Sequence, residues 1–303
     1  MSDHMYTGAM TQIDHWSNEE HRCSFLAEQL RRGCLSLVLG AGVSIAFNLP
    51  DWNELIAHME KLMKVDCPSV LTDNMEKAEW LKEQCKDEAE YIEFVRQALY
   101  KDGKAFDMSS MSINTTLNAI TALSAHSKRG AVKNILTFNF DNILEIYLRF
   151  HGRVVSTHAN GNKYSEDSDV NIYHMHGYLP NPESTVKEAC SKHIIFDKKS
   201  YDDVKDYTFW EWYPKVADLL RTHTCIFIGL SGEDENMDRF LKDTKKNHAN
   251  IESGDLYWGV SFVGNPTTAV LERWEDWGVY PVPITDFGRI PEQLFHIVRK
   301  LNP

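Results

Sequence analysis

The chain has 303 residues, of which 43% are hydrophobic, and a formal net charge of −12 at pH 7. This length can bury a sizeable core, while the acidic balance argues against a broad nucleic-acid surface or a polybasic membrane anchor. No apolar run approaches the ~20 residues that a membrane-spanning helix needs. The N-terminus also lacks the features of a signal peptide. We therefore expect a cytoplasmic protein that binds neither membrane nor nucleic acid directly.

Six cysteines are spread along the chain without a CxxC pair: Cys23, Cys34, Cys67, Cys85, Cys190 and Cys225. Their spacing indicates neither a zinc site nor a disulfide framework. Reduced cytoplasmic thiols are the simplest interpretation, and we expect no bound zinc.

The N-terminal 20 residues are polar and aperiodic, which predicts a mobile arm ahead of one domain over residues 21–303. Residues 17–32 predict a helix with Ser17 as its cap and Gly33 as its stop. The apolar stretch Leu35–Leu39, which glycines bound, is typical of a buried parallel strand.

Apolar residues then recur at helical spacing in residues 51–65, 75–99 and 113–124, and each stretch predicts one helix. Their methionine and aromatic stripes are expected to pack into the core. We interpret residues 53–132 as a helical insertion between two strands of a sheet.

Strand and helix patterns alternate through the rest of the chain. Expected strands lie at 135–140, 154–157, 171–176, 194–196, 224–230, 256–263 and 279–284; expected helices lie at 141–150, 198–222, from about 234, 267–277 and 291–301. This alternation predicts an α/β fold, a doubly wound parallel (Rossmann-like) sheet with an inserted helical subdomain.

A glycine-rich turn, Gly40, Ala41 and Gly42, follows the first expected strand. Its small side chains would let backbone N–H groups approach a pyrophosphate. The dinucleotide fingerprint, however, has a small residue where this chain has Ile45, and no acidic strand end follows about 20 residues later. A tight structural turn is therefore an alternative.

The expected strand at 135–140 ends in the sequence TFNFD. Strand alternation places Thr137, Asn139 and Asp141 on one side, at the edge where ligands bind in such sheets. As an alternative, Asp141 caps the next helix and Asn139 satisfies a turn.

Two later strand ends also carry polar residues. In HMHG, His174 and His176 are expected to share a face; HxH could be a metal pair, but no third ligand stands out. For GLSGEDEN at 229–236, two interpretations are open: the segment contacts a ligand, or it caps the helix that follows.

These four motifs, in this order, resemble those of the sirtuin family. GAGVS at 40–44 with LPDW at 49–52 is similar to the sirtuin GAG-[IV]-S and PDF segment, and TFNFD to TQNxD. HMHG at 174–177 is similar to the catalytic HG, and GLSGEDEN to the ribose-binding GxS segment. The resemblance covers residues 33–285.

The chain also departs from the sirtuin deacylases. It lacks their two CxxC zinc pairs, Phe138 replaces a glutamine, and Asn53 replaces an arginine. In these respects it resembles the sirtuin-like branch of bacterial anti-phage defence, whose members hydrolyse NAD. Thoeris effectors and the sirtuin-like partners of HerA-type ATPases belong to that branch.

The resemblance implies an NAD glycohydrolase that cleaves the nicotinamide–ribose bond and needs no zinc. Asn139 would orient the ribose or a water, Asp141 would accept from the carboxamide, and His176 would be the base. The residues that bind NAD would be Gly40, Ala41, Gly42, Ser44, Asp51, Thr137, Ser231 and Asp234.

Three alternatives to hydrolysis remain open at this point. Two are enzymes that would use the same site, an NAD-dependent deacylase and an ADP-ribosyltransferase. The third is a non-catalytic module that senses NAD or ADP-ribose. Because a toxic NADase should be silent by default, we expect a homo-oligomer or a partner such as a HerA-like ATPase.

Overall fold

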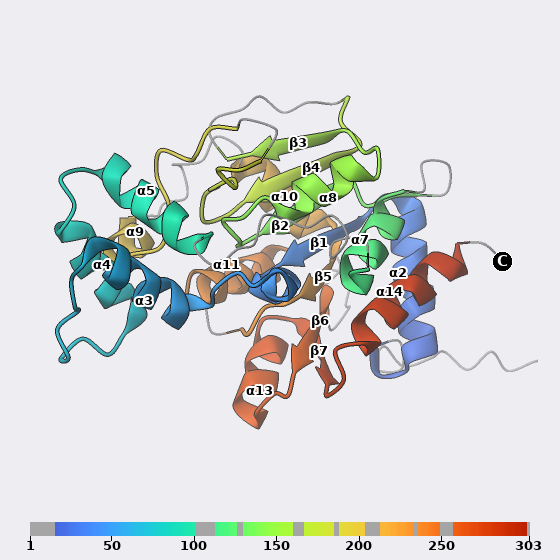
Figure 1. Ribbon diagram of the computed structural model, residues 1–303. Coiled ribbons are helices and arrows are strands. Elements are labelled where there is room, and N and C mark those ends of the chain that lie inside the picture. Colours follow the sequence, from blue (N-terminus) through green and yellow to red (C-terminus); the bar gives the residue numbers. More distant parts are fainter. Residues whose placement is uncertain are drawn as a thin grey trace, which may run out of the picture.

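The computed structural model describes residues 16–100, 113–125, 130–159, 167–184, 188–203, 213–232, 235–248 and 257–301 (Figure 1). Most of the expected N-terminal arm lies outside these residues. From Trp16 on, the chain is packed instead: Trp16 is buried and its ring lies 5.2 Å from that of Phe25. Helix α2 (Glu19–Arg32) follows, and its cap is Asn18 rather than Ser17.

Seven strands form one parallel sheet in the order β3-β4-β2-β1-β5-β6-β7. Their bounds are β1 (Leu35–Leu39), β2 (Asn134–Thr137), β3 (Val155–His158), β4 (Val170–His174), β5 (Thr224–Ile228), β6 (Gly259–Gly264) and β7 (Val279–Ile284). The predicted parallel α/β fold is confirmed.

The order of the strands reverses at β1. From β1 the chain adds β2, β3 and β4 on one side, and it then crosses to add β5, β6 and β7 on the other. In doubly wound sheets, the crevice beyond the carboxyl ends at such a reversal is where ligands bind. The turn after β1 and the turn after β5 meet at this position.

Helices cover both faces of the sheet (Figure 1). Alternate strand residues belong to two apolar cores: Leu37 and Ile135 to one, Val38 and Leu136 to the other. The first core takes in α2, α7 (Thr115–Ser124), α8 (Ile143–Phe150) and α14 (Arg289–Lys300), and the second α10 (Tyr213–Thr222), α11 (Glu235–Asn247) and α13 (Thr268–Asp276). Strands buried on both faces explain the continuous apolar runs in the sequence.

A helical lobe lies to one side of the sheet, at the left of Figure 1. It contains α3 (Trp52–Met63), α4 (Asn74–Glu83), α5 (Glu88–Leu99) and the short α9 (Lys198–Asp203). The prediction of one helix over residues 75–99 is wrong. The chain breaks between α4 and α5, where Asp87 caps α5 by accepting from the Glu90 N–H at 2.9 Å.

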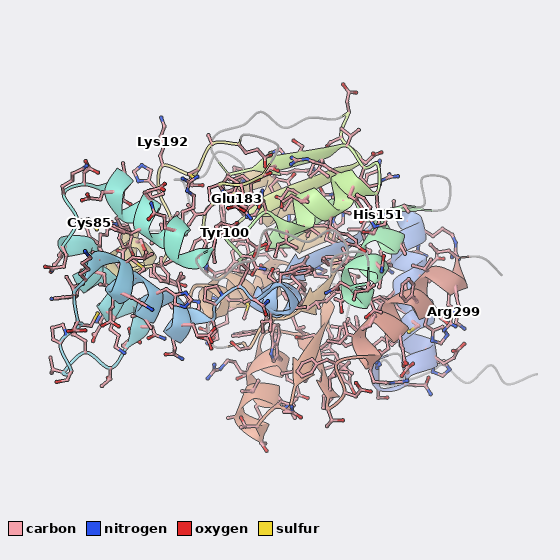
Figure 2. All side chains as sticks on the ribbon, in the orientation of Figure 1. Cys85, Tyr100, His151, Glu183, Lys192 and Arg299 are labelled. Carbon is pink, nitrogen blue, oxygen red and sulfur yellow. The ribbon has the colours of Figure 1, made fainter. Side chains whose placement is uncertain are left out.

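Polar contacts join α4 and α5 of the lobe to the chain segment between β4 and α9. Lys82 of α4 pairs with the fully buried Asp197 at 3.0 Å. Tyr100, at the end of α5, donates its hydroxyl to the Leu179 carbonyl at 2.7 Å, and Figure 2 shows it between the lobe and the sheet. The lobe is therefore anchored close to the chain segment that follows β4.

The expected strand at 194–196 is not a strand in the structure. The Ile195 N–H donates to the His176 carbonyl at 2.8 Å, but no ladder extends from this bond among the described residues. Residues 198–222, expected to be mostly helical, contain α9 and α10, and residues 204–212 lie outside the described part. Within the part of the chain that the structure describes, no helix is long and apolar enough to cross a membrane.

Candidate functional site

The glycine turn after β1 packs directly against the turn after β5. Gly40 N–H donates to the Ile228 carbonyl at 3.0 Å, and Gly42 N–H to the Gly229 carbonyl at 3.0 Å. A Cβ on Gly42 would lie 2.6 Å from the Gly229 Cα, and one on Gly40 would lie 2.5 Å from the Gly229 carbonyl oxygen. Side chains at these positions would force the two turns apart, so their close approach explains the glycines.

The same turn has few N–H groups left for a phosphate. Val43 N–H donates to the Gly40 carbonyl at 3.2 Å and Ser44 N–H to the Ala41 carbonyl at 2.9 Å, while the Gly42 N–H is bonded to Gly229. Ala41 and Gly42 are exposed. The structure thus gives the glycines a packing role, and their contact with a phosphate stays a prediction.

Asn139 connects the end of β2 to the glycine turn. Its side-chain amide donates to the Gly40 carbonyl and to the Ser44 hydroxyl, both at 3.1 Å. Its backbone N–H donates to the Thr137 hydroxyl at 3.1 Å. The structure therefore brings four of the predicted site residues into one hydrogen-bonded group.

Asp141 lies in the same group and is buried. One carboxylate oxygen accepts from the Ile143 N–H at 3.0 Å, at the start of α8. Burial raises the pKa of Asp141 to about 6; the bond from Ile143 and the Ser44 hydroxyl oppose this rise, and the charge of Glu145 adds to it. The N-cap residue of α8 is Asn142, so the Asp141 carboxyl is bonded to the first N–H of the helix from the position before the cap.

A small cavity of about 10 Å³ lies among these side chains. Its polar lining consists of Ser44, Thr137, Asn139, Asp141, Glu145 and His174. That volume is about one probe sphere, enough for a single water. A nicotinamide ring is larger than this cavity, which would have to widen to admit it. The nearby turn is open to solvent at three exposed residues, Ala41, Gly42 and Ile45.

The two histidines of HMHG do not share a face. His174 lines the cavity, and its ring bonds to the Asn139 carbonyl oxygen at 2.8 Å and to a Glu145 carboxylate oxygen at 2.7 Å. His176 packs instead against Phe138 and Phe140, with ring centroids 5.0 and 6.4 Å away. The expectation of a shared face is wrong because β4 ends at His174, and strand alternation does not extend past it.

His176 is buried in an aromatic surround that also includes Tyr201, whose ring centroid lies 5.5 Å away. Tyr201 packs against Trp52 of the helical lobe, at 6.3 Å. The lobe thus helps to fix the predicted base. His176 does not line the small cavity.

Two of the remaining predicted residues, Asp51 and Ser231, belong to the described part of the chain. Asp51 caps α3 in a capping box, where its carboxylate accepts from the Glu54 N–H at 2.9 Å. Ser231 is exposed on the turn after β5, and Asp234 lies outside the described residues.

Glu145 was not among the predicted site residues. It is fully buried in α8 and lies one helical turn after Asp141. A lone carboxylate within the otherwise apolar stretch ILEIYL was the signal that could have identified it, since charged residues are rarely buried without a partner.

The cysteines do not fit a zinc site. They lie in separate segments of the chain, with Cys85 out in the helical lobe (Figure 2) and Cys225 inside β5. Burial raises the pKa of Cys23 to about 11, which favours the thiol over the thiolate that binds metals. Among the described residues, no group of three histidine, cysteine or carboxylate side chains could hold a metal ion.

Part of this group lies in a stretch of the chain that is similar to a known protein family. Residues 133–282 match the family model of the SIR2-like domain. The SIR2-like region begins at β2 and extends into β7, so it contains Asn139, Asp141, both histidines of HMHG and the Gly229 turn.

A solved structure described as "Structural Basis for the Mechanism and Regulation of Sir2 Enzymes" is similar to this chain at 14% sequence identity. The match has a TM-score of 0.47 and covers 92% of this chain and 96% of that one. No curated protein matches this chain.

Proposed function

We propose that this protein is an NAD glycohydrolase, which converts NAD and water to nicotinamide and ADP-ribose. The observation that carries the proposal is the Asn139 side chain, which bonds to both Gly40 and Ser44 beside the buried carboxyl of Asp141. This polar group lies where the sheet order reverses, which is the expected place for a nucleotide. The SIR2-like match of residues 133–282 supports an enzyme that uses NAD.

The reaction breaks the bond between the nicotinamide nitrogen and C1′ of the ribose. The bonding electron pair leaves with nicotinamide, a neutral molecule, so no acid is required at that nitrogen. Positive charge develops on the ribose, as in other glycosyl transfers. A water oxygen then bonds to C1′, and its proton passes to His176 as base.

Each residue of the group has one task in this scheme. The amide of Asn139 orients the ribose or the attacking water, and the Asp141 carboxyl accepts from the carboxamide N–H₂. The glycine turn and Ser44 hold the pyrophosphate, and Ser231 contacts the adenosine side. The surrounding aromatic side chains exclude bulk water, which strengthens the polar contacts.

Deacylation by the same site is less well supported. Sirtuin deacylases hold zinc through two CxxC pairs, and the cysteines of this chain do not fit such a site. ADP-ribosyl transfer and NAD sensing differ from hydrolysis only in the acceptor or in the absence of turnover, so they are outcomes of the test below.

The test is to incubate the pure protein with NAD and no acceptor, and to quantify nicotinamide and ADP-ribose. Hydrolysis predicts equal amounts of both products. Nicotinamide without free ADP-ribose would indicate transfer to the protein, and NAD binding without release under any activating condition would overturn the enzyme proposal.

We further propose that NAD depletion by this protein serves anti-phage defence, and that assembly controls it. The four motifs and the missing zinc pairs support this assignment, since they resemble the sirtuin-like defence proteins. A homo-oligomer or a complex with a HerA-like ATPase would keep the site silent. Sedimentation of the protein alone and with such an ATPase, beside the turnover assay, tests this.

A further inference from the structure

His174 and Glu145 form a buried pair beneath the candidate site. Neither side chain is exposed to solvent, and His174 Nε2 lies 2.7 Å from Glu145 Oε1. The other ring nitrogen, Nδ1, lies 2.8 Å from the carbonyl oxygen of Asn139. The Asn139 carbonyl is an acceptor and so is an ionised Glu145 carboxylate, whereas a neutral imidazole has only one N–H to donate. The geometry therefore fits a charged imidazolium that donates from both nitrogens.

The groups packed around His174 favour the same state. Burial opposes the charge, but the carboxylate of Glu145, the Asn139 carbonyl and Asp141 together raise the pKa of His174 above its usual value. The Thr157 hydroxyl donates to the same Glu145 oxygen at 3.4 Å. The Tyr178 ring packs on His174 with centroids 4.6 Å apart.

The bond from His174 matters because Asn139 lies beyond the last residue of β2. Within this group, two bonds hold the backbone of Asn139: its N–H donates to the Thr137 hydroxyl, and its carbonyl oxygen bonds to His174 Nδ1. Its side chain reaches from this fixed backbone to Gly40 and Ser44. An imidazolium with both N–H groups in use also has no lone pair with which to act as a base.

We propose that the buried His174–Glu145 pair is a positioning device that clamps the Asn139 carbonyl and so fixes the Asn139 side chain, which acts on the reacting ribose in the proposed function. The effect on turnover rests on the proposed function. The clamp itself can be measured without turnover.

The decisive variant is Glu145→Gln, which keeps the size and the hydrogen bond but removes the charge. Misplacing a reacting group can lower a rate by about 10²-fold, so we expect kcat to fall by about that factor with little change in KM. The alkaline limb of the kcat–pH profile should move to lower pH, because His174 loses its charged partner.

His158→Gln is the matched control. His158 is also fully buried, on the neighbouring strand β3, and its Nε2 bonds to the amide oxygen of Asn171 at 2.9 Å. This variant should lose stability to a similar degree but keep the wild-type kcat and pH profile. If His158→Gln lowers kcat as much as Glu145→Gln does, the effect is structural and the proposal is wrong.

Nitrogen-15 spectra of histidine-labelled protein give a readout that needs no turnover. In the wild type at pH 7, both ring nitrogens of His174 should be protonated, and in Glu145→Gln the ring should lose a proton at lower pH. The Asn139 side-chain amide protons should also exchange faster with water in the variant. A neutral His174 ring in the wild type, or unchanged exchange of Asn139 in Glu145→Gln, overturns the clamp.

These readouts separate the two proposals. If the wild type shows a doubly protonated His174 ring and protected Asn139 but never releases nicotinamide, the clamp stands and the proposed function is wrong. If Glu145→Gln has the wild-type rate and pH profile of turnover, the proposed function stands and the clamp is wrong.

Discussion

Gly42 and Gly229 meet backbone to backbone, with the Gly42 N–H bonded to the Gly229 carbonyl at 3.0 Å. The contact joins the turns that follow β1 and β5, two strands far apart in the sequence. It leaves no room for a methyl group on Gly42, because the Gly229 Cα would lie 2.6 Å from it.

Gly42→Ala should therefore disrupt the site and destabilise the protein by about 1–3 kcal/mol, the usual cost of overpacking. Gly288→Ala is the control, since a Cβ there would meet only the Asp286 side chain, at 3.2 Å. Urea unfolding and NAD titration measure both effects. A Gly42→Ala protein with wild-type stability and NAD affinity would refute the packing role.

His176→Ala should abolish nicotinamide release and leave the fold intact. Loss of a general base lowers rates by about 10²–10⁴-fold. Product analysis with the purified variant, beside circular dichroism, measures both. If His176→Ala keeps its activity, the base has been assigned to the wrong residue.

Asn139→Ala should lower turnover far more than NAD affinity, because its hydrogen bond is needed mainly as charge develops on the ribose. Calorimetric titration and a turnover assay separate the two quantities. Asn53→Ala, an exposed asparagine whose side chain accepts from Asn74, serves as the control. A sensor would show the reverse for Asn139, with weaker binding and no turnover to lose.

The raised pKa of Asp141 predicts how the unfolding free energy of the protein depends on pH. Its pKa is about 6 in the folded protein against a reference value of 3.8, so its bound proton stabilises the fold at low pH. That contribution is lost as the pH rises from about 4 through about 6, and it amounts to about 3 kcal/mol at most.

Asp141→Asn should remove this loss, since an amide oxygen can still accept from the Ile143 N–H. We expect the variant to match the wild type in unfolding free energy near pH 4 and to exceed it near pH 8, while nicotinamide release falls. Asp141→Ala should be less stable than Asp141→Asn by about 0.5–2 kcal/mol, because the first N–H of α8, that of Ile143, loses its side-chain acceptor. If the difference in unfolding free energy between the wild type and Asp141→Asn does not change with pH, the raised pKa of the buried Asp141 carboxyl is contradicted.

Activity should survive metal chelators, and the purified protein should carry no stoichiometric zinc. Elemental analysis and an assay after dialysis against a chelator check this. One tightly bound zinc per chain would contradict our interpretation of the cysteines and reopen the deacylase alternative.

The sheet could be predicted from sequence because its strands are short apolar runs between glycines and helix caps. The break between α4 and α5 was missed, since one charged, periodic stretch spans both helices and only Asp87 marks the new start. The false strand at 194–196 has the right composition, but among the described residues it finds no partner strand to form a ladder.

At the site, strand alternation was enough to group Thr137, Asn139 and Asp141, and the resemblance to sirtuins added Ser44; the structure places all four together. The positions of the two histidines were not predictable from alternation, because they depend on where β4 ends. The partnership of His174 with Glu145 joins a strand to a helix that precedes it in the sequence, and single-sequence patterns do not report such contacts.

The central position of β1 also has a consequence for biosynthesis. β1 is made first, yet one of its two neighbours, β5, is made late. Pairing between strands so distant along the chain is slow and awaits the later segment. A ribosome that has released only the first half of this chain therefore carries a glycine turn without its Gly229 counterpart, and the contact between the two turns cannot form before β5 and Gly229 have been made.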